Sequence, residues 1–236
     1  MKTIGLIGGM SWESTAVYYQ EINRLIRKRY GGLASADMVI RSLNFETIVA
    51  MQAEGDWDAA AEELSIAGLA LEAAGADCVL ICTNTMHLVA DKVIERLTVP
   101  VINIIDVTAD ALLAAGLHEP LLLATRYTME HGFYADQMAR RGVNVRVPRQ
   151  ADRDQIHSII FSELCQGRIE VSSRLKMAKI IDQFRNGGAD SVIFGCTEIG
   201  LLLDPRNQLL PCFDSAILHA ISAVDFASPH LPSTKI

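Results

Sequence analysis

An internal repeat restricts the fold of this chain more than any other feature of its sequence. The segment 75–85 (GADCVLICTNT) aligns without a gap on the segment 188–198 (GADSVIFGCTE), with each residue 113 positions from its match. In both copies Gly-Ala-Asp precedes an apolar run that ends in polar residues. A spacing of 113 residues is much longer than the roughly 20–50 residues of solenoid repeats. The repeat therefore predicts two similar halves, although any two helix–glycine–strand–loop units would share part of this pattern.

Strand-like apolar runs alternate with helical patterns along the chain. The predicted strands are 3–8, 38–43, 78–82, 101–104, 121–124, 143–147, 192–195 and 208–212, and the predicted helices are 14–30, 57–74, 87–96, 107–115, 129–140, 155–165, 171–186 and 215–226. Several strands are continuously apolar, which is typical of strands covered by helices on both faces. This order predicts an α/β fold with mainly parallel sheets. We expect residues 1–105 with 209–236 to form the first α/β domain and residues 106–208 the second. The tail from Ser228 onward, with two prolines, is expected to fray.

Composition narrows the class of partner. Half of the 236 residues are hydrophobic, which excludes a disordered chain. The net charge of −7 argues against nucleic acid and anionic membranes as partners, because both attract positive surfaces. No apolar run approaches the ~18–20 residues of a membrane span, and the N-terminal apolar stretch is too short for a signal peptide. We therefore expect a cytoplasmic protein whose partner is a small molecule or another protein.

The two copies of the repeat end in polar residues at corresponding positions. Thr83-Asn84-Thr85 follows one predicted strand, and Cys196-Thr197-Glu198 follows the other. Ligands of open α/β sheets bind at the carboxyl ends of the strands. If a pseudo-twofold relates the halves, the two strand ends meet over one cleft and present groups to opposite faces of one substrate. Asn84 and Thr85 are also suited to capping the next helix.

Five cysteines occur, at spacings that match neither C-x-x-C nor a zinc site, so we expect free thiols and no metal. Cys196 falls at the exposed position of the second repeat, before a predicted helix whose dipole would lower the pKa of its thiol. Cys82 aligns with Gly195 and is expected to be the last buried strand residue, which leaves Thr83 exposed. Cys78, Cys165 and Cys212 are expected in the core.

The turn Gly8-Gly9-Met10-Ser11 follows the first predicted strand. Glycines at such a turn let backbone N–H groups approach an anion at a helix N-terminus. The pattern is neither a complete dinucleotide fingerprint nor a Walker A loop, so it supports a nucleotide site only weakly. A tight strand-to-helix turn explains it equally well.

Four motifs, in order along the chain, resemble those of the aspartate/glutamate racemase family. They are Gly5-x-x-Gly8-Gly9-Met10, Cys82-Thr83-Asn84-Thr85-Met86-His87, Thr125-x-x-Thr128-Met129 and Gly195-Cys196-Thr197-Glu198. The resemblance implies a racemase without pyridoxal phosphate, metal or other cofactor, built from two Rossmann-like halves with the active site between them, usually as a homodimer. In this family one cysteine lies on each face of the substrate's α-carbon: one thiolate removes the α-proton, and the opposite thiol protonates the carbanion.

One position departs from the family pattern. The first family cysteine directly precedes the Asn-Thr pair, where this chain has Thr83, and the repeat independently aligns Thr83 with Cys196. A cysteine thiol can be tuned to a thiolate near neutral pH, whereas a threonine hydroxyl is too weakly acidic to be a comparable base. We therefore predict an asymmetric site of the L-aspartate/glutamate-specific type, with Cys196 as the base and Thr83 as its counterpart.

The resemblance also suggests substrate contacts. The backbone N–H groups of residues 83–85 and 197–198 would hold the α-carboxylate. Met10 and Gln52 match positions that line the family's substrate pocket. Arg168 and Arg126 are hypothetical partners for a side-chain carboxylate, and each is also readily explained as a surface charge. His87, His219 and Asp214 lie near strand ends, where they would support the site or merely cap helices.

Other functions stay open at the level of the sequence. A hydantoin racemase or a single-cysteine decarboxylase of the same superfamily would also show one reactive cysteine. A non-catalytic amino-acid-sensing module would share the fold, but it would gain nothing from an exposed thiol. An NAD-dependent enzyme would require an acidic residue about 20 residues beyond a complete glycine fingerprint, and the chain lacks this arrangement.

Overall fold

The computed structural model of the chain describes residues 1–229 and divides into two compact units. Unit 1 contains Met1–Asn103 and the chain from His219, and unit 2 contains Ile104–Leu218. Each unit has its own parallel sheet and its own hydrophobic cluster, so each is described by itself. The tail expected to fray falls, from residue 230 on, outside the described residues.

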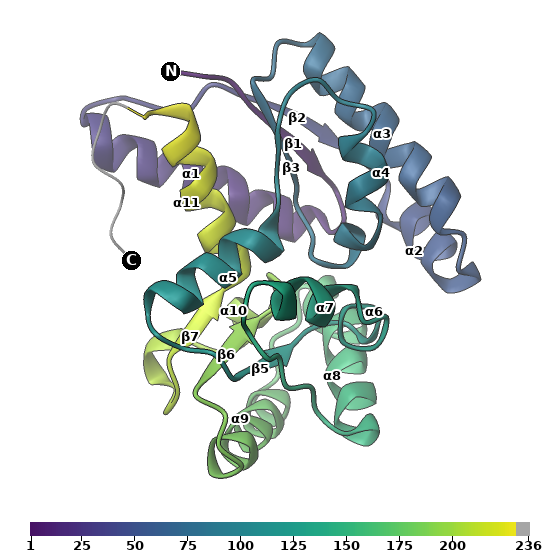
Figure 1. Cartoon of the computed structure of the whole chain (residues 1–236), viewed down its shortest axis with the longest axis vertical. Coiled ribbons are helices and arrows are strands. Elements are labelled where there is room, and N and C mark those ends of the chain that lie inside the picture. Colours follow the sequence, from purple (N-terminus) through teal and green to yellow (C-terminus); the bar gives the residue numbers. More distant parts are fainter. Residues whose placement is uncertain (230–236) are drawn as a thin grey trace. The chain divides into compact units, whose positions relative to one another are not determined.

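Unit 1 is built on a four-stranded parallel sheet in the order β2-β1-β3-β4. The strands are β1 (Ile4–Gly8), β2 (Met38–Ser42), β3 (Cys78–Ile81) and β4 (Val101–Ile102), and the helices are α1 (Trp12–Tyr30), α2 (Phe45–Glu54), α3 (Trp57–Ala73), the 3₁₀ helix η1 (Thr85–Val89) and α4 (Ala90–Ile94). In Figure 1, α1 and α3 lie on opposite sides of these strands. Every residue of β1 and β3 is buried, as the continuous apolar runs predict for strands covered on both faces.

Unit 2 is built on a three-stranded parallel sheet in the order β5-β6-β7. The strands are β5 (Pro120–Leu123), β6 (Ser191–Phe194) and β7 (Cys212–Asp214), and the helices are α5 (Ile104–Ala114), α6 (Arg126–Glu130), α7 (Phe133–Arg140), α8 (Gln150–Ser162), η2 (Leu164–Gln166), α9 (Val171–Asn186), α10 (Ile199–Leu202) and η3 (Pro205–Asn207). Helix α11 (Ser215–Ala227) begins in unit 2 and continues in unit 1. Leu121, Ile193 and Phe194 are fully buried in the core of unit 2.

The repeat in the sequence appears in the structure as two equivalent strands. β3 and β6 begin and end at matching repeat positions, and each lies between two other strands of its sheet. The aspartate before each strand has the same role: Asp77 Oδ2 accepts the backbone N–H of Thr3 at 2.7 Å, and Asp190 Oδ2 accepts that of His118 at 2.7 Å. Thr3 and His118 lie just before β1 and β5. In both copies of the repeat, the aspartate therefore hydrogen-bonds to the segment that leads into the neighbouring strand.

Three sequence predictions need correction. The second unit extends to Leu218 rather than 208, because β7 hydrogen-bonds to β6 in the register Val192↔Cys212. The strand predicted over 208–212 lies instead at Cys212–Asp214, and Leu209 is 70% exposed. The strand predicted over 143–147 is reduced to one bridge between Arg146 and Leu121.

The helices differ from prediction mainly where the chain turns sharply. The helices predicted over 87–96 and 129–140 are each broken in two, and the helix over 155–165 starts earlier, at Gln150. Helix α2 was not predicted, because Ile48 and Gln52 are its only buried residues and too few to set a helical period. The mainly parallel α/β architecture is confirmed.

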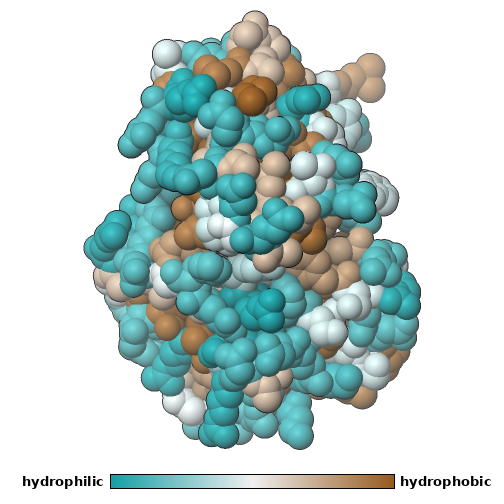
Figure 2. Space-filling model, turned by 90° about the vertical axis from the view of Figure 1, so that its right-hand side faces the viewer, coloured by the Kyte–Doolittle hydropathy of each residue, from teal (hydrophilic) through white to brown (hydrophobic). Residues whose placement is uncertain are grey.

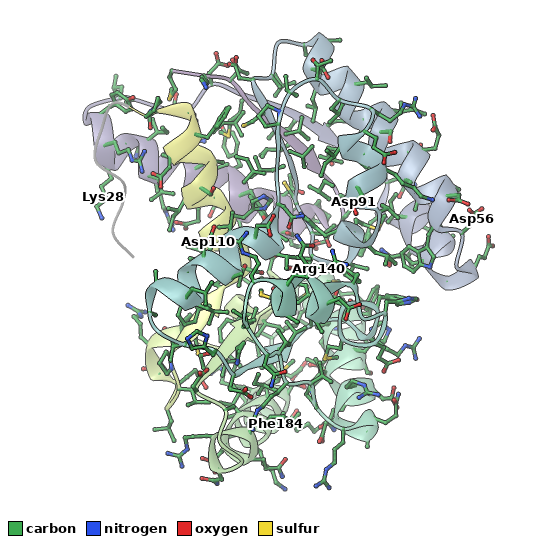
Figure 3. All side chains as sticks on the ribbon, viewed as in Figure 1. Lys28, Asp56, Asp91, Asp110, Arg140 and Phe184 are labelled. Atoms are coloured by element: carbon green, nitrogen blue, oxygen red, sulfur yellow. The ribbon has the colours of Figure 1, made fainter. Side chains whose placement is uncertain are left out.

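The face of the molecule shown in Figure 2 is mainly hydrophilic, with hydrophobic residues in smaller groups. Lys28 and Asp56 point outward in Figure 3, and both are exposed. Within residues 1–229, no helix is long and apolar enough to cross a membrane.

Candidate active site

The turn after β1 is fixed by close backbone packing. Gly9 has φ 82°, and a Cβ at this position would lie 2.2 Å from the Leu43 carbonyl oxygen, so only glycine fits. Thr15 Oγ1 accepts the Gly9 N–H at 2.8 Å and donates to the Ser11 carbonyl at 2.9 Å. Ser11 caps α1 by accepting the Ser14 N–H. The N–H of Gly9 is thus used inside the turn, which favours a structural role for this motif.

The end of β3 buries every residue of its motif except one. Cys82 is 1% exposed, and burial raises the pKa of its thiol far above the usual value. Thr83 is half-buried, whereas Asn84 and Thr85 are 3% and 4% exposed. The predicted orientation of Cys82 and Thr83 is therefore consistent with their burial. The Thr83 N–H donates to the Ile81 carbonyl at 2.8 Å, so in this structure it bonds within the chain.

His87 bonds to the end of β3, and the His219 ring lies beside it, with the ring centroids 6.0 Å apart. His87 Nδ1 bonds to the Thr83 carbonyl at 2.8 Å, and since a carbonyl only accepts, this nitrogen carries the proton. His219 Nε2 likewise donates to the Ile102 carbonyl at 2.7 Å, so its Nδ1 accepts the Tyr18 hydroxyl at 2.8 Å. Burial and the neighbouring His87 lower the pKa of His219 to about 3, which keeps it neutral.

Two further predicted contact residues lie in the interior of unit 1. Met10 is 5% exposed and belongs to the hydrophobic cluster of this unit. Gln52, on α2, is also 5% exposed, and its amide Nε2 lies 3.2 Å from the Met86 sulfur. Because Met86 belongs to the β3-end motif, this contact joins Gln52 to the segment that carries Thr83.

The end of β6 leaves no room for a side chain at Gly195. A Cβ there would lie 2.7 Å from Leu122 Cδ1 and 3.1 Å from Ala124 Cβ. The absence of a side chain lets the strand pack against β5, and Cys196 follows as a half-buried residue. Thr197 and Glu198 are 6% and 4% exposed.

Cys196 lies beside a buried carboxylate. Its Sγ donates to Glu198 Oε2 at 3.0 Å, and the other oxygen, Oε1, lies 3.7 Å from Cys165 Sγ. Burial, followed by the charge of Glu198 and the neighbouring Cys165, raises the pKa of Cys196 well above its ordinary value. The prediction of a dipole-lowered pKa is therefore wrong. α10 has only four residues, and desolvation with a carboxylate neighbour outweighs its dipole.

The remaining predicted residues have structural partners. Arg168 is exposed, and its guanidinium donates to the Ser162 carbonyl and to Gln166. Asp214 Oδ1 accepts the backbone N–H groups of Ala216 and Ile217 at the start of α11. Thr125 caps α6 by accepting the Thr128 N–H at 3.4 Å. None of these contacts tests a role in substrate binding.

Cys165 was expected in the core, and its contact with Glu198 was missed by the sequence reasoning. Its thiol is half-buried on η2, 33 residues before Glu198. No local pattern joins the two residues, because η2 and the β6–α10 turn meet only in the folded unit. Within residues 1–229, no group of three or more His, Cys, Asp or Glu side chains is arranged to hold a metal ion.

Comparisons with known proteins agree with these motifs. Residues 7–223 match the family model for Asp/Glu/Hydantoin racemase. The chain belongs to this family. It is therefore an isomerase of the amino-acid racemase type.

Solved structures and a characterised relative resemble this racemase over nearly its whole length. A candidate Asp/Glu racemase from Yersinia pestis is 43% identical, with 96% of this chain and 99% of that chain covered and a TM-score of 0.89. An aspartate racemase homologue from Pyrococcus horikoshii is 33% identical, with 97% and 100% covered and a TM-score of 0.85. The broad specificity amino-acid racemase RacX of Bacillus subtilis is 22% identical over 94% of this chain and 96% of its own.

Proposed function

We propose that this racemase exchanges the α-proton of aspartate or glutamate without a cofactor and reacts preferentially with the L-enantiomers. One observation carries the proposal: Cys196 lies 3.0 Å from the Glu198 carboxylate at the end of β6, whereas the equivalent position at the end of β3 is Thr83. The first strand end has a hydroxyl where the second has a thiol with a proton acceptor. The second is therefore the better equipped to remove a proton from carbon.

The proposed reaction uses the two residues on opposite faces of the α-carbon. The Cys196 thiolate removes the α-proton of the L-substrate, and the electron pair passes into the α-carboxylate as a planar carbanion forms. Thr83 donates or relays a proton to the other face and gives the D-product. Because a threonine hydroxyl is a poor base, removal of the α-proton from the D-enantiomer is the slower step.

Substrate contacts are proposed from the same motifs. The side chains of Asn84, Thr85 and Thr197, with the available backbone N–H groups up to Glu198, would bind the α-carboxylate and α-ammonium groups. Met10 and Gln52 would line the side-chain pocket, and Arg168 would pair with a distal carboxylate after leaving its contact with Ser162. Its exposure makes this rearrangement inexpensive.

The equilibrium constant of racemisation is one, so kcat/KM for net conversion must be equal in both directions. The L preference therefore appears in hydrogen exchange at the α-carbon rather than in the position of equilibrium. Any bias in net turnover would come from saturation, product inhibition or incomplete reaction cycles.

A broad-specificity amino-acid racemase is the second proposed function. Gln52 is neutral, and its amide bonds to the Met86 sulfur rather than offering a positive charge to a side-chain carboxylate. The similarity to RacX, whose name denotes broad specificity, favours the same alternative.

One substrate panel tests both proposals. The protein is incubated with L-aspartate, L-glutamate and neutral L-amino acids, and the products are separated by chiral chromatography. Conversion of the two acidic substrates alone supports the first proposal, and conversion of neutral ones supports the second. Evolved CO₂ would instead identify a decarboxylase, and no reaction with any substrate would contradict both proposals.

We also propose a cytoplasmic homodimer. Trp12 and Tyr19 are 68% and 52% exposed and stand seven residues apart on α1, so they lie on one face of that helix. Burial of such large apolar side chains favours association. Light scattering on the purified protein would give twice the chain mass of 25.8 kDa, and a monomeric mass would contradict the proposal.

A further inference from the structure

The Glu198 carboxylate contacts two thiols that come from separate segments of unit 2. Its carboxylate is bound on one oxygen by Cys196, two residues earlier, and approached on the other by Cys165 from η2. Glu198 is 4% exposed, so its charge is balanced by these donors rather than by bulk water. Cys165 is thus placed to keep Oε2 directed at the Cys196 sulfur.

The surroundings favour one negative charge in this cluster rather than two. Burial and the Glu198 charge raise the pKa of Cys196, so loss of its proton to solvent would leave two adjacent buried anions. A transfer from sulfur to Oε2 avoids this cost, because the S–H bond breaks, an O–H bond forms and the charge moves from the carboxylate to sulfur. The Glu198 backbone N–H hydrogen-bonds to Cys196 and favours the thiolate that results.

We infer that Glu198 accepts the proton of Cys196 and thereby forms the catalytic thiolate, while Cys165 positions Glu198 for this transfer. The inference rests on the proposed function and gives Glu198 and Cys165 positioning roles that act through Cys196. After the transfer, the sulfur takes the α-proton of the L-substrate. Proton sharing between sulfur and Oε2 then allows solvent hydrogen to return to carbon.

Other charged groups on the neighbouring elements have different partners. Arg168, after η2, donates to the Ser162 carbonyl, and Asp214, at the end of β7, caps α11. The electrostatic neighbours that the structure gives for Cys196 are Glu198 and Cys165. In the first repeat, the positions of Cys196 and Glu198 are held by Thr83 and Thr85, so the thiol and the carboxylate are both replaced there.

Two measurements on the full-length protein test the inference. The first follows iodoacetamide alkylation of the Cys196 peptide by mass spectrometry as a function of pH. The second follows loss of the α-proton of L-glutamate or L-aspartate in D₂O by NMR, with kcat and KM separated. In E198Q the midpoint of Cys196 alkylation should fall, because a like charge is removed. The kcat for exchange should nevertheless fall about 100-fold or more, with KM within about threefold.

The alkylation midpoint and the exchange rate, measured together, distinguish proton transfer from electrostatic or structural effects. If Glu198 merely disfavoured the thiolate, E198Q would have more thiolate and would exchange faster. E198D, which keeps a carboxylate, should retain more activity than E198Q. C165A should lose about five- to tenfold in kcat, and C165S, which keeps a donor, should recover most of that loss.

C212S is the matched control. Cys212 is a half-buried thiol of the same unit whose sulfur bonds to the Leu210 carbonyl, so its replacement should leave exchange unchanged. E198Q exchange equal to or faster than wild type, or an unshifted Cys196 midpoint, would overturn the inference alone. A wild-type protein that exchanges no amino-acid α-proton would overturn the proposed function and, with it, the catalytic role of Glu198.

Discussion

The ends of β3 and β6 share their backbone plan and differ in their chemistry. The last strand residues occupy the same repeat positions, and Cys82 N and Gly195 N donate to the equivalent carbonyls of Ile7 and Leu123 at 3.0 and 2.8 Å. Beyond these residues, β3 is followed by Thr83 and Thr85, and β6 by Cys196 and Glu198 at the matching repeat positions. Under the proposed function, these equal backbone positions with unequal acid–base groups would perform different steps.

The two strand ends also differ in what supports them. At the first, His87 Nδ1 donates to the Thr83 carbonyl. The second is held by a carboxylate with a thiol on each oxygen. The first arrangement orients a backbone carbonyl. The second places a thiol against a carboxylate, and the proposed base depends on this pair.

Loss of the Cys196 thiol should have the largest effect. Cys196→Ser replaces the sulfur with a hydroxyl, so both strand ends then present alcohols. We expect L-side exchange to fall about 1,000-fold or more, in line with loss of a general base. α-Proton exchange in D₂O, followed by NMR, measures this. Retention of a tenth of wild-type exchange would show that Cys196 is not the base.

A thiol at the first strand end should make the two sides more alike. Thr83→Cys places a sulfur at the position equivalent to Cys196, and D-side exchange should rise about 10- to 100-fold. The double variant Thr83→Cys/Cys196→Ser should exchange the D-substrate in preference to the L-substrate. Chiral chromatography and NMR on both variants check the reversal. A double variant that still prefers the L-substrate would contradict the assignment of faces.

Acid should destabilise unit 1 through His219. Its pKa is lowered to about 3 in the folded state, against 6.5 when unperturbed, so between these values the unfolded chain binds a proton that the folded chain does not. The free energy of unfolding is therefore highest above pH 6.5. Below that pH it falls by up to about 1.4 kcal/mol per pH unit, because protons bind to His219 in the unfolded chain.

Urea unfolding at pH 7.5 and 5.5 measures this loss. Both tryptophans, Trp12 and Trp57, lie in unit 1, so their fluorescence reports on that unit. His219→Gln should reduce the pH dependence, at the cost of lower stability at pH 7.5. An equal pH dependence in wild type and variant would show that His219 does not bind the decisive proton.

The smallest expected effect is the difference in stability lost when each of the two equivalent aspartates is replaced by alanine. Asp77 accepts one neighbouring-strand N–H, from Thr3, whereas Asp190 accepts two, from His118 and Glu119. Asp190→Ala should lower the free energy of unfolding by about 2 kcal/mol and the more exposed Asp77→Ala by about 1 kcal/mol. Circular dichroism in urea compares them, and a larger loss for Asp77→Ala would contradict this ranking.

Local pattern was sufficient to predict the parts of the fold that repeat. β3 and β6 were found because Gly-Ala-Asp and an apolar run occur twice, and α9 was found over its full length because its period is regular. The pattern of residues 143–147 predicts a strand, but only Arg146 pairs with another strand. A strand forms only where the edge of a sheet is available beside it. Sequence alone does not reveal such an edge.

The chemistry of the site was predictable in kind but not in its state of protonation. The motif around Cys196 identified the thiol, and alternation along the strand separated Cys82 from Thr83. The pKa of Cys196 was predicted in the wrong direction, because its burial and the approach of Cys165 depend on η2, which is distant in sequence. The role of Glu198 as its hydrogen-bond partner likewise required the fold.

The central claim is that the Cys196 side removes a proton from carbon faster than the Thr83 side does. The most direct test places wild-type protein in D₂O with L-glutamate or D-glutamate at equal concentration below saturation, and follows each α-proton by NMR. The account predicts that the L-enantiomer loses its α-proton about tenfold faster or more. Equal rates of loss from the two enantiomers would contradict it.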